Sequence, residues 1–166
     1  MDQKTLDNLA ASFAGESQAR NKYLAFAKKA DEEGFHQIAR LFRAVAQAEF
    51  VHAQNHFKAM EGIQSTAENL QTAVAGEHFE VTTMYPPYIE EAKAAGEKQA
   101  ARSMDWAWDV EKGHEVLYTE ALEGINAPQE EFEYYVCPVC GNTVPRNAPD
   151  RCSVCGTPGS RFEKIA

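Results

Sequence analysis

Two short stretches of the sequence each combine a glutamate with a histidine three residues later. The first is Glu49-x-x-His52 and the second is Glu111-x-x-His114. On a helix, residues three positions apart share a face, with Cβ atoms about 5–6 Å apart. Each pair can therefore present one oxygen and one nitrogen to the same metal ion.

Earlier glutamates complete this pattern at matched distances. Glu16 precedes Glu49 by 33 positions, and Glu77, with Glu80 close behind it, precedes Glu111 by 34. The match suggests an internal duplication of a helical hairpin. Carboxylates buried together are too costly without cations, and two hard cations bind carboxylate oxygens together with one histidine each. One Glu-x-x-His pair alone is more often an ordinary solvated helix face, but two pairs at matched spacing predict a di-metal carboxylate site.

All four cysteines lie near the end of the chain, as two Cys-x2-Cys-Gly repeats. They are Cys137, Cys140, Cys152 and Cys155. This spacing is typical of a site in which four thiolates bind one metal ion. Disulfides are the alternative, but nothing in the sequence indicates secretion. Iron and zinc both accept four thiolates, and the spacing does not decide between them.

Four helices are expected to position the carboxylates and histidines, over residues 5–33, 35–60, 65–96 and 97–123. A glycine is expected to end each one: Gly34, Gly62, Gly96 and Gly124. Ser65-x-x-Glu68 resembles a capping box at the start of the third helix. Pro86 and Pro87 fall inside that helix, so we expect a kink there. Four helices with short connections predict an all-α four-helix bundle.

Composition sets the domain organisation and excludes some partners. The chain has 166 residues, 44% of them hydrophobic, and a formal net charge of −9. We expect a helical domain over residues 1–126 and a small metal-bound domain of turns and short strands over residues 127–166. The acidic charge argues against nucleic acid and anionic membranes as partners. No apolar run is long enough to span a membrane and no secretion signal is seen, so a cytoplasmic location is expected.

Several motifs together resemble the rubrerythrin family, over residues from about 5 to 166. They are Gly15-Glu16-Ser17, Ala48-Glu49-Phe50-Val51-His52, Gly76-Glu77-His78-Phe79-Glu80, Met84-Tyr85-Pro86, Glu111-x-x-His114 and the Cys-Pro-x-Cys-Gly tail. The resemblance implies a ferritin-like di-iron bundle followed by a rubredoxin-like domain with one iron held by four cysteines. It favours iron over zinc in the four-cysteine site by analogy.

The resemblance also implies a role for each candidate residue. Glu49 and Glu111 would bridge the two irons. Glu16, with Glu80 or His52, would complete one iron, and Glu77 and His114 would complete the other. Glu80 and His52 match the positions that exchange as the first iron moves between the oxidised and the reduced state in this family. Two tyrosines, Tyr23 and Tyr85, match hydroxyl groups that contact the metal-bound carboxylates; they also fit as core aromatics.

The activity implied is the reduction of hydrogen peroxide to water. Electrons would come from NAD(P)H through a separate reductase or rubredoxin and pass through the four-cysteine iron. The chain itself has no Gly-x-Gly-x-x-Gly motif for a dinucleotide. One alternative is an iron-handling ferroxidase of the ferritin type, although a fused four-cysteine module favours electron transfer. A second alternative is a zinc-ribbon interaction module attached to a structural bundle.

The connection between the second and third expected helices is unusually short. A helix of about 26 residues is about 39 Å long, whereas the five residues 61–65 span at most about 18 Å. The chain therefore cannot return along the bundle to start a parallel third helix. Either the bundle runs up-down-up-down, or the two hairpins of one chain pair with those of a second chain. Because ferritin-like bundles have parallel second and third helices, we predict a domain-swapped homodimer.

Overall fold

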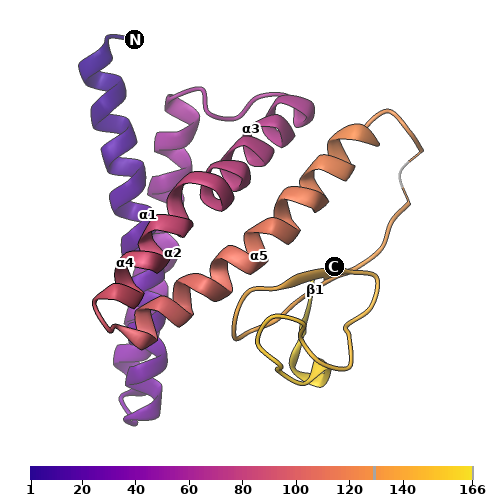
Figure 1. Cartoon of the computed structure of the whole chain (residues 1–166). Helices are drawn as coiled ribbons and strands as arrows, with labels where there is room; N and C mark the ends of the chain where they lie inside the picture. Colours follow the sequence, from indigo (N-terminus) through magenta and orange to yellow (C-terminus); the bar gives the residue numbers. More distant parts are fainter. Residues whose placement is uncertain (129, 166) are drawn as a thin grey trace. The chain divides into compact units, whose positions relative to one another are not determined.

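The computed structural model describes residues 1–128 and 130–165 and is shown in Figure 1. Gln129 and Ala166, both in the predicted C-terminal domain, lie outside the described residues. The chain divides into two compact units, Met1–Gln64 and Ser65–Ala166. Each unit is described below by itself.

The first unit is a hairpin of two long helices, α1 (Gln3–Glu32) and α2 (His36–Ala59). Asp2 caps α1 by accepting a hydrogen bond from the Thr5 N–H. Gly34, at a φ of +83°, ends α1, and the next N–H, that of Phe35, donates back to the Ala30 carbonyl. A left-handed residue in this place favours glycine, so the turn predicted at Gly34 is confirmed.

Small side chains line the seam between α1 and α2. The buried residues of the two helices are all alanines: Ala27, Ala30, Ala39, Ala46 and Ala53. Larger apolar side chains on the same helices stay exposed, among them Leu41 at 61% and Ile38 at 49%. The hairpin therefore has tightly apposed backbones and an apolar surface that two helices alone do not enclose.

The second unit begins with one long, interrupted helical run. It comprises α3 (Thr66–Phe79), a π-helical turn η1 (Glu80–Met84) and α4 (Tyr85–Ala94). The predicted capping box is present, with Ser65 and Glu68 bonded reciprocally. After Gly96, at a φ of +76°, helix α5 (Lys98–Glu123) contacts α3, η1 and α4. Pro86 and Pro87 lie in the first turn of α4, directly after the π-turn. The kink predicted at these prolines therefore takes the form of a π-helical turn before them.

The end of α2 differs from the prediction at one residue. The left-handed position is taken by Glu61, with a φ of +57°, and not by Gly62. The Gly62 N–H donates to the Phe57 carbonyl, and a Cβ at position 62 would run into the Phe57 ring. Glycine is therefore needed at position 62 for space and not for its backbone angle.

The tail of the second unit contains a small antiparallel sheet in the order β2-β1-β3. Its strands are β1 (Tyr134–Val136), β2 (Thr143–Pro145) and β3 (Glu163–Ile165), with a 3₁₀ turn, η2 (Gly159–Arg161), before β3. Turns and short strands were predicted here. Across the described residues, none of the helices combines the length and apolar character needed to cross a membrane.

Candidate metal centres

The first cluster of possible metal ligands lies within the α1–α2 hairpin. Ligand atoms of Glu16, on α1, and of Glu49 and His52, on α2, all lie within 4.8 Å of one another. His52 Nδ1 lies 3.0 Å from Glu49 Oε2, as expected for residues three apart on a helix. Two carboxylates and one imidazole form a donor set that suits a divalent transition metal such as iron.

The second cluster has the same composition and lies within Ser65–Ala166. It combines Glu77 of α3 with Glu111 and His114 of α5, again within 4.8 Å. His114 Nδ1 lies 2.6 Å from Glu111 Oε2. The pKa of Glu77 is raised to about 7. Burial is the largest cause, and the neighbouring Glu111 carboxylate is the second. Carboxylates held this close repel each other, and a bound cation removes the repulsion, so the residues present fit a metal ion.

Glu80 and Tyr85 flank the second cluster. Burial and the Glu111 carboxylate raise the pKa of Glu80. Burial also raises the pKa of Tyr85, and the carboxylates of Glu80, Glu111 and Glu77 raise it further. Tyr85 therefore remains a protonated phenol that can donate a hydrogen bond beside these carboxylates.

The remaining histidines and tyrosines have other surroundings. The Tyr23 ring lies against Phe26 and Phe42, each with its centroid 6.2 Å away. His78 Nδ1 lies 2.8 Å from Glu115 Oε1 at the exposed surface. Tyr23 is half-buried in this aromatic group, and both alternatives for it, a packing aromatic and a hydroxyl donor to a metal-bound carboxylate, stay predictions.

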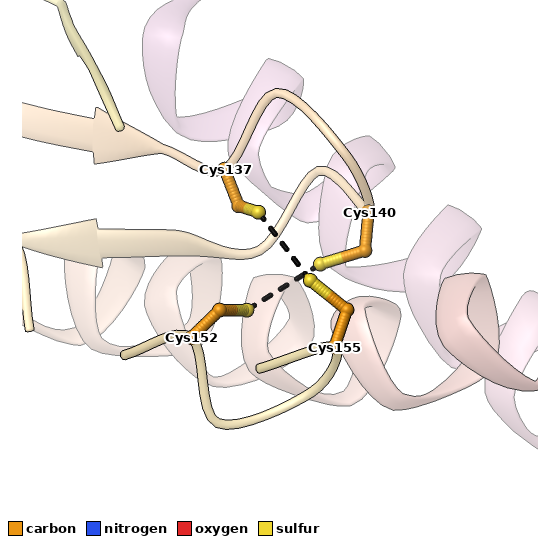
Figure 2. A group of neighbouring side chains, drawn as sticks. All are labelled: Cys137, Cys140, Cys152 and Cys155. Atoms are coloured by element: carbon orange, nitrogen blue, oxygen red, sulfur yellow. Dashed lines mark hydrogen bonds between the residues drawn. The ribbon is translucent and has the colours of Figure 1, made fainter. Parts of the chain in front are cut away.

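The four cysteines converge from two loops, as Figure 2 shows. The Sγ atoms of Cys137 and Cys155 are 3.6 Å apart, and those of Cys140 and Cys152 are 3.5 Å apart. All four cysteines are free thiols, so the disulfide alternative is wrong. A tetrahedral ion with sulfur ligands at about 2.3 Å separates them by just under 4 Å, so the donor set fits one such ion.

The two cysteine loops have matching backbones. Gly141 and Gly156 have φ angles of +84° and +76°, and each donates its N–H to the carbonyl of the first cysteine in its loop. Burial opposes ionisation of the Cys155 thiol, but hydrogen bonds from Thr157 lower its pKa to about 6. A cysteine that ionises readily is a ready metal ligand, because only the thiolate binds metal.

Two residues near these clusters could not be identified from the sequence. Thr143 of β2 bonds to His114, and Trp108 of α5 donates its indole N–H to the Val81 carbonyl. Neither residue belongs to a ligand motif, and both contacts join segments more than 25 positions apart. Only the folded chain brings them to the site.

The comparisons with known proteins agree with this geometry. The family profile of rubrerythrin matches residues 7–122. Rubrerythrin of Porphyromonas gingivalis is 37% identical, over 98% of this chain and 90% of its own. Rubrerythrin-2 of Clostridium acetobutylicum is 33% identical, over 96% of this chain and 95% of its own. The solved structure of nigerythrin in a partially reduced state has a TM-score of 0.59 at 34% identity, covering 97% of this chain and 86% of its own.

The chain belongs to the rubrerythrin family, whose members are di-iron oxidoreductases that act on peroxide in oxidative-stress defence. The predicted fold class, a ferritin-like helical bundle with a small rubredoxin-like domain, is confirmed. The predicted cofactors, a di-iron centre and one iron in a four-cysteine site, are confirmed at the level of the family and the ligand clusters. The role of each single ligand and the domain boundary at residue 126 stay predictions.

Proposed function

We propose that this protein reduces hydrogen peroxide to water with electrons that originate from NAD(P)H. One observation carries the proposal: a single chain holds two matched carboxylate–histidine clusters and a four-cysteine cluster. Iron storage or iron oxidation needs only the carboxylate–histidine site. A four-cysteine iron handles one electron at a time and is suited to feeding electrons to another centre.

The reaction needs two electrons and two protons to convert one peroxide to two waters. A di-iron pair, when bound, supplies both electrons without releasing a radical. We assign the bridging positions to Glu49 and Glu111. The outer ligands would be Glu16 with His52 or Glu80 on one iron, and Glu77 with His114 on the other.

The chain's own side chains would orient the substrate and hold protons. Tyr85 remains protonated beside three carboxylates, so its hydroxyl can donate a hydrogen bond to a metal-bound carboxylate or to peroxide. Tyr23 is assigned the equivalent position on the other side of the site. The exchange of Glu80 and His52 at one iron is part of the same proposal.

Electrons would enter through the four-cysteine site from an external partner. The chain has no Gly-x-Gly-x-x-Gly motif, so NAD(P)H would bind to a separate reductase, directly or through a rubredoxin. The formal charge of −9 argues against nucleic acid as a partner. The cytoplasmic location stays a prediction.

We also propose that the protein works as a domain-swapped homodimer. Each half of the ligand set lies in a different unit, and the boundary between the units along the chain falls between Gln64 and Ser65. Helix α2 has 24 residues, a length of about 36 Å, whereas the chain from Ala59 to Thr66 reaches at most about 25 Å. A second chain can supply the parallel partner that this connection cannot reach.

The test is steady-state peroxide reduction by the iron-loaded protein with NADH, a flavoprotein reductase and rubredoxin. We expect one NADH consumed per peroxide. Cys152→Ser should stop this turnover, whereas Ser153→Ala, in the same loop, should not. If Fe²⁺ oxidation by dioxygen is fast while NADH-coupled turnover stays at background, the ferroxidase alternative replaces the proposal.

A further inference from the structure

The His114 ring lies between two groups that belong to different parts of the second unit. Its Nδ1 faces Glu111 Oε2 at 2.6 Å, and its Nε2 lies 2.9 Å from the Thr143 hydroxyl. Thr143 is the first residue of β2 and follows Cys140 by three positions. One imidazole therefore joins a carboxylate–histidine cluster to the four-cysteine loop.

The direction of the Nε2 contact follows from the number of protons available. A hydroxyl has one proton to donate, and Thr143 donates it to the Gly141 carbonyl at 3.0 Å. The 2.6 Å contact of Nδ1 with the Glu111 carboxylate is a hydrogen bond, and a metal ion that binds Nδ1 displaces its proton. The ring proton then lies on Nε2, and the Thr143 oxygen accepts a hydrogen bond from it.

The same peptide group continues the connection to a sulfur ligand. The Gly141 carbonyl, which accepts from Thr143, belongs to the peptide whose N–H is that of Asn142. That N–H donates to the Cys140 sulfur. Three hydrogen bonds and one peptide therefore connect His114 to Cys140, and every donor points toward the sulfur. Hydrogen bonds aligned in this way strengthen one another.

We propose that Thr143 is a positioning residue that couples the two kinds of metal site through this hydrogen-bonded chain. It holds the metal-bound His114 with its ring proton on Nε2, and it passes a change of charge at that metal to the Cys140 sulfur. A cation on Nδ1 makes the Nε2–H a stronger donor. The donors along the chain then withdraw more charge from the sulfur, which favours the reduced state of the four-cysteine iron.

The inference rests on the proposed role of His114 as a metal ligand, but not on peroxidase activity.

Two variants of Thr143 test the inference. Thr143→Val keeps the shape of the side chain and removes the hydroxyl, whereas Thr143→Ser keeps the hydroxyl. Thr143→Ala serves as a second hydroxyl-free variant if valine disturbs β2. The ultraviolet–visible spectrum of the ferric four-cysteine site confirms that each variant has folded.

The first measurement is the nitrogen-15 NMR spectrum of the full-length chain with zinc in its metal sites. We expect a slowly exchanging Nε2–H signal from His114 in the parent protein and in Thr143→Ser. The signal should be lost by exchange with water in Thr143→Val. A parent protein protonated on Nδ1 instead would overturn the tautomer assignment.

The second measurement is the reduction potential of the four-cysteine iron before and after Zn²⁺ is added to the carboxylate–histidine clusters. We expect zinc to raise the potential in the parent protein and in Thr143→Ser, and to raise it much less in Thr143→Val and Thr143→Ala. An equal rise in all four proteins would show that the charge acts through space, and the coupling role of Thr143 would be wrong. Loss of the rise in Thr143→Ser as well would mean that the methyl group, and not the hydroxyl, matters.

Discussion

Glu49 and Glu111 occupy equivalent places in the two units of the chain. Each uses Oε2 to face the Nδ1 of the histidine three residues later, at 3.0 Å and 2.6 Å. Each also has a glutamate from another helix of its unit close by, Glu16 of α1 in one case and Glu77 of α3 in the other. The repeated geometry agrees with the predicted duplication, and the bridging role of both glutamates remains a proposal.

Removing either central glutamate should therefore empty the di-iron site. We expect Glu49→Ala and Glu111→Ala to lose iron from the carboxylate site and to lose peroxidase activity, while the four-cysteine iron keeps its colour. Iron per chain and the visible spectrum measure the two sites separately. Glu115→Ala is a matched control, because this residue lies one turn after Glu111 and pairs with His78 at the surface. Full turnover in either bridging variant would contradict the assignment.

The raised pKa of Glu77 makes metal binding depend on pH. Burial and the Glu111 carboxylate raise this pKa to about 7, so the metal-free chain holds a proton here below pH 7 that a metal must displace. Apparent zinc affinity should fall as pH decreases below 7, by up to about tenfold per unit for this one proton. Competition with a chelator, with iron already in the four-cysteine site, measures the slope. Glu77→Gln should bind more weakly and with a shallower slope, whereas Glu120→Gln, at an exposed position of α5, should keep the parent slope.

Among the elements, the π-turn η1 shows how the chain adapts a helix to its site. The Tyr85 N–H donates to the Glu80 carbonyl, five residues back. The Val81 carbonyl would next accept from residue 86, but that residue is proline and has no N–H. The Trp108 indole N–H fills this place at 2.8 Å. A side chain of α5 thus stabilises the turn that carries Glu80.

Replacing this one donor should weaken the turn. Trp108→Phe keeps an aromatic ring under the Lys112 ammonium, which lies 3.3 Å from the ring centroid, but removes the N–H. We expect a loss of about 1 kcal/mol in the free energy of unfolding, because a partly buried carbonyl loses its donor. Urea denaturation of the metal-free protein measures it. Trp106→Phe, on the same helix, should have a smaller effect, and equal losses in the two variants would argue against the role of Trp108.

The elements also show which features the sequence could predict. The helices, the Ser65 cap, the turns at Gly34 and Gly96 and the cysteine loops all depend on residues within a few positions of one another, so local chemistry indicates them. The prolines predict an interruption of the helix, but the hydrogen bond that completes the π-turn comes from Trp108, which lies 27 positions from Val81. The bond between Thr143 and His114 spans 29 positions. Such contacts need the folded chain, and no local pattern predicts them.

For the whole molecule, the exposed apolar side chains and the short connection lead to the same proposal. Leu41, Phe35 and Ile38 are exposed on the α1–α2 hairpin, at 61%, 56% and 49%. Phe79 and Val116 are exposed on α3 and α5, at 53% and 54%. Large exposed apolar side chains on helices that carry half a ligand set each are expected to be covered in the working assembly. A second copy of the chain would cover them and complete both sites.

Mixing two inactive variants tests this assembly in solution. In a swapped dimer of a Glu49→Ala chain with a Glu111→Ala chain, one site receives both changes and the other receives neither. The second site regains every ligand, so the heterodimer should have about half the activity of the parent dimer. The two chains are co-expressed with different affinity tags, purified in sequence, and compared with each variant alone. If the purified heterodimer is as inactive as its parents, each site is built within one chain, and the connection at residues 60–65 must instead join two antiparallel helices of the same bundle.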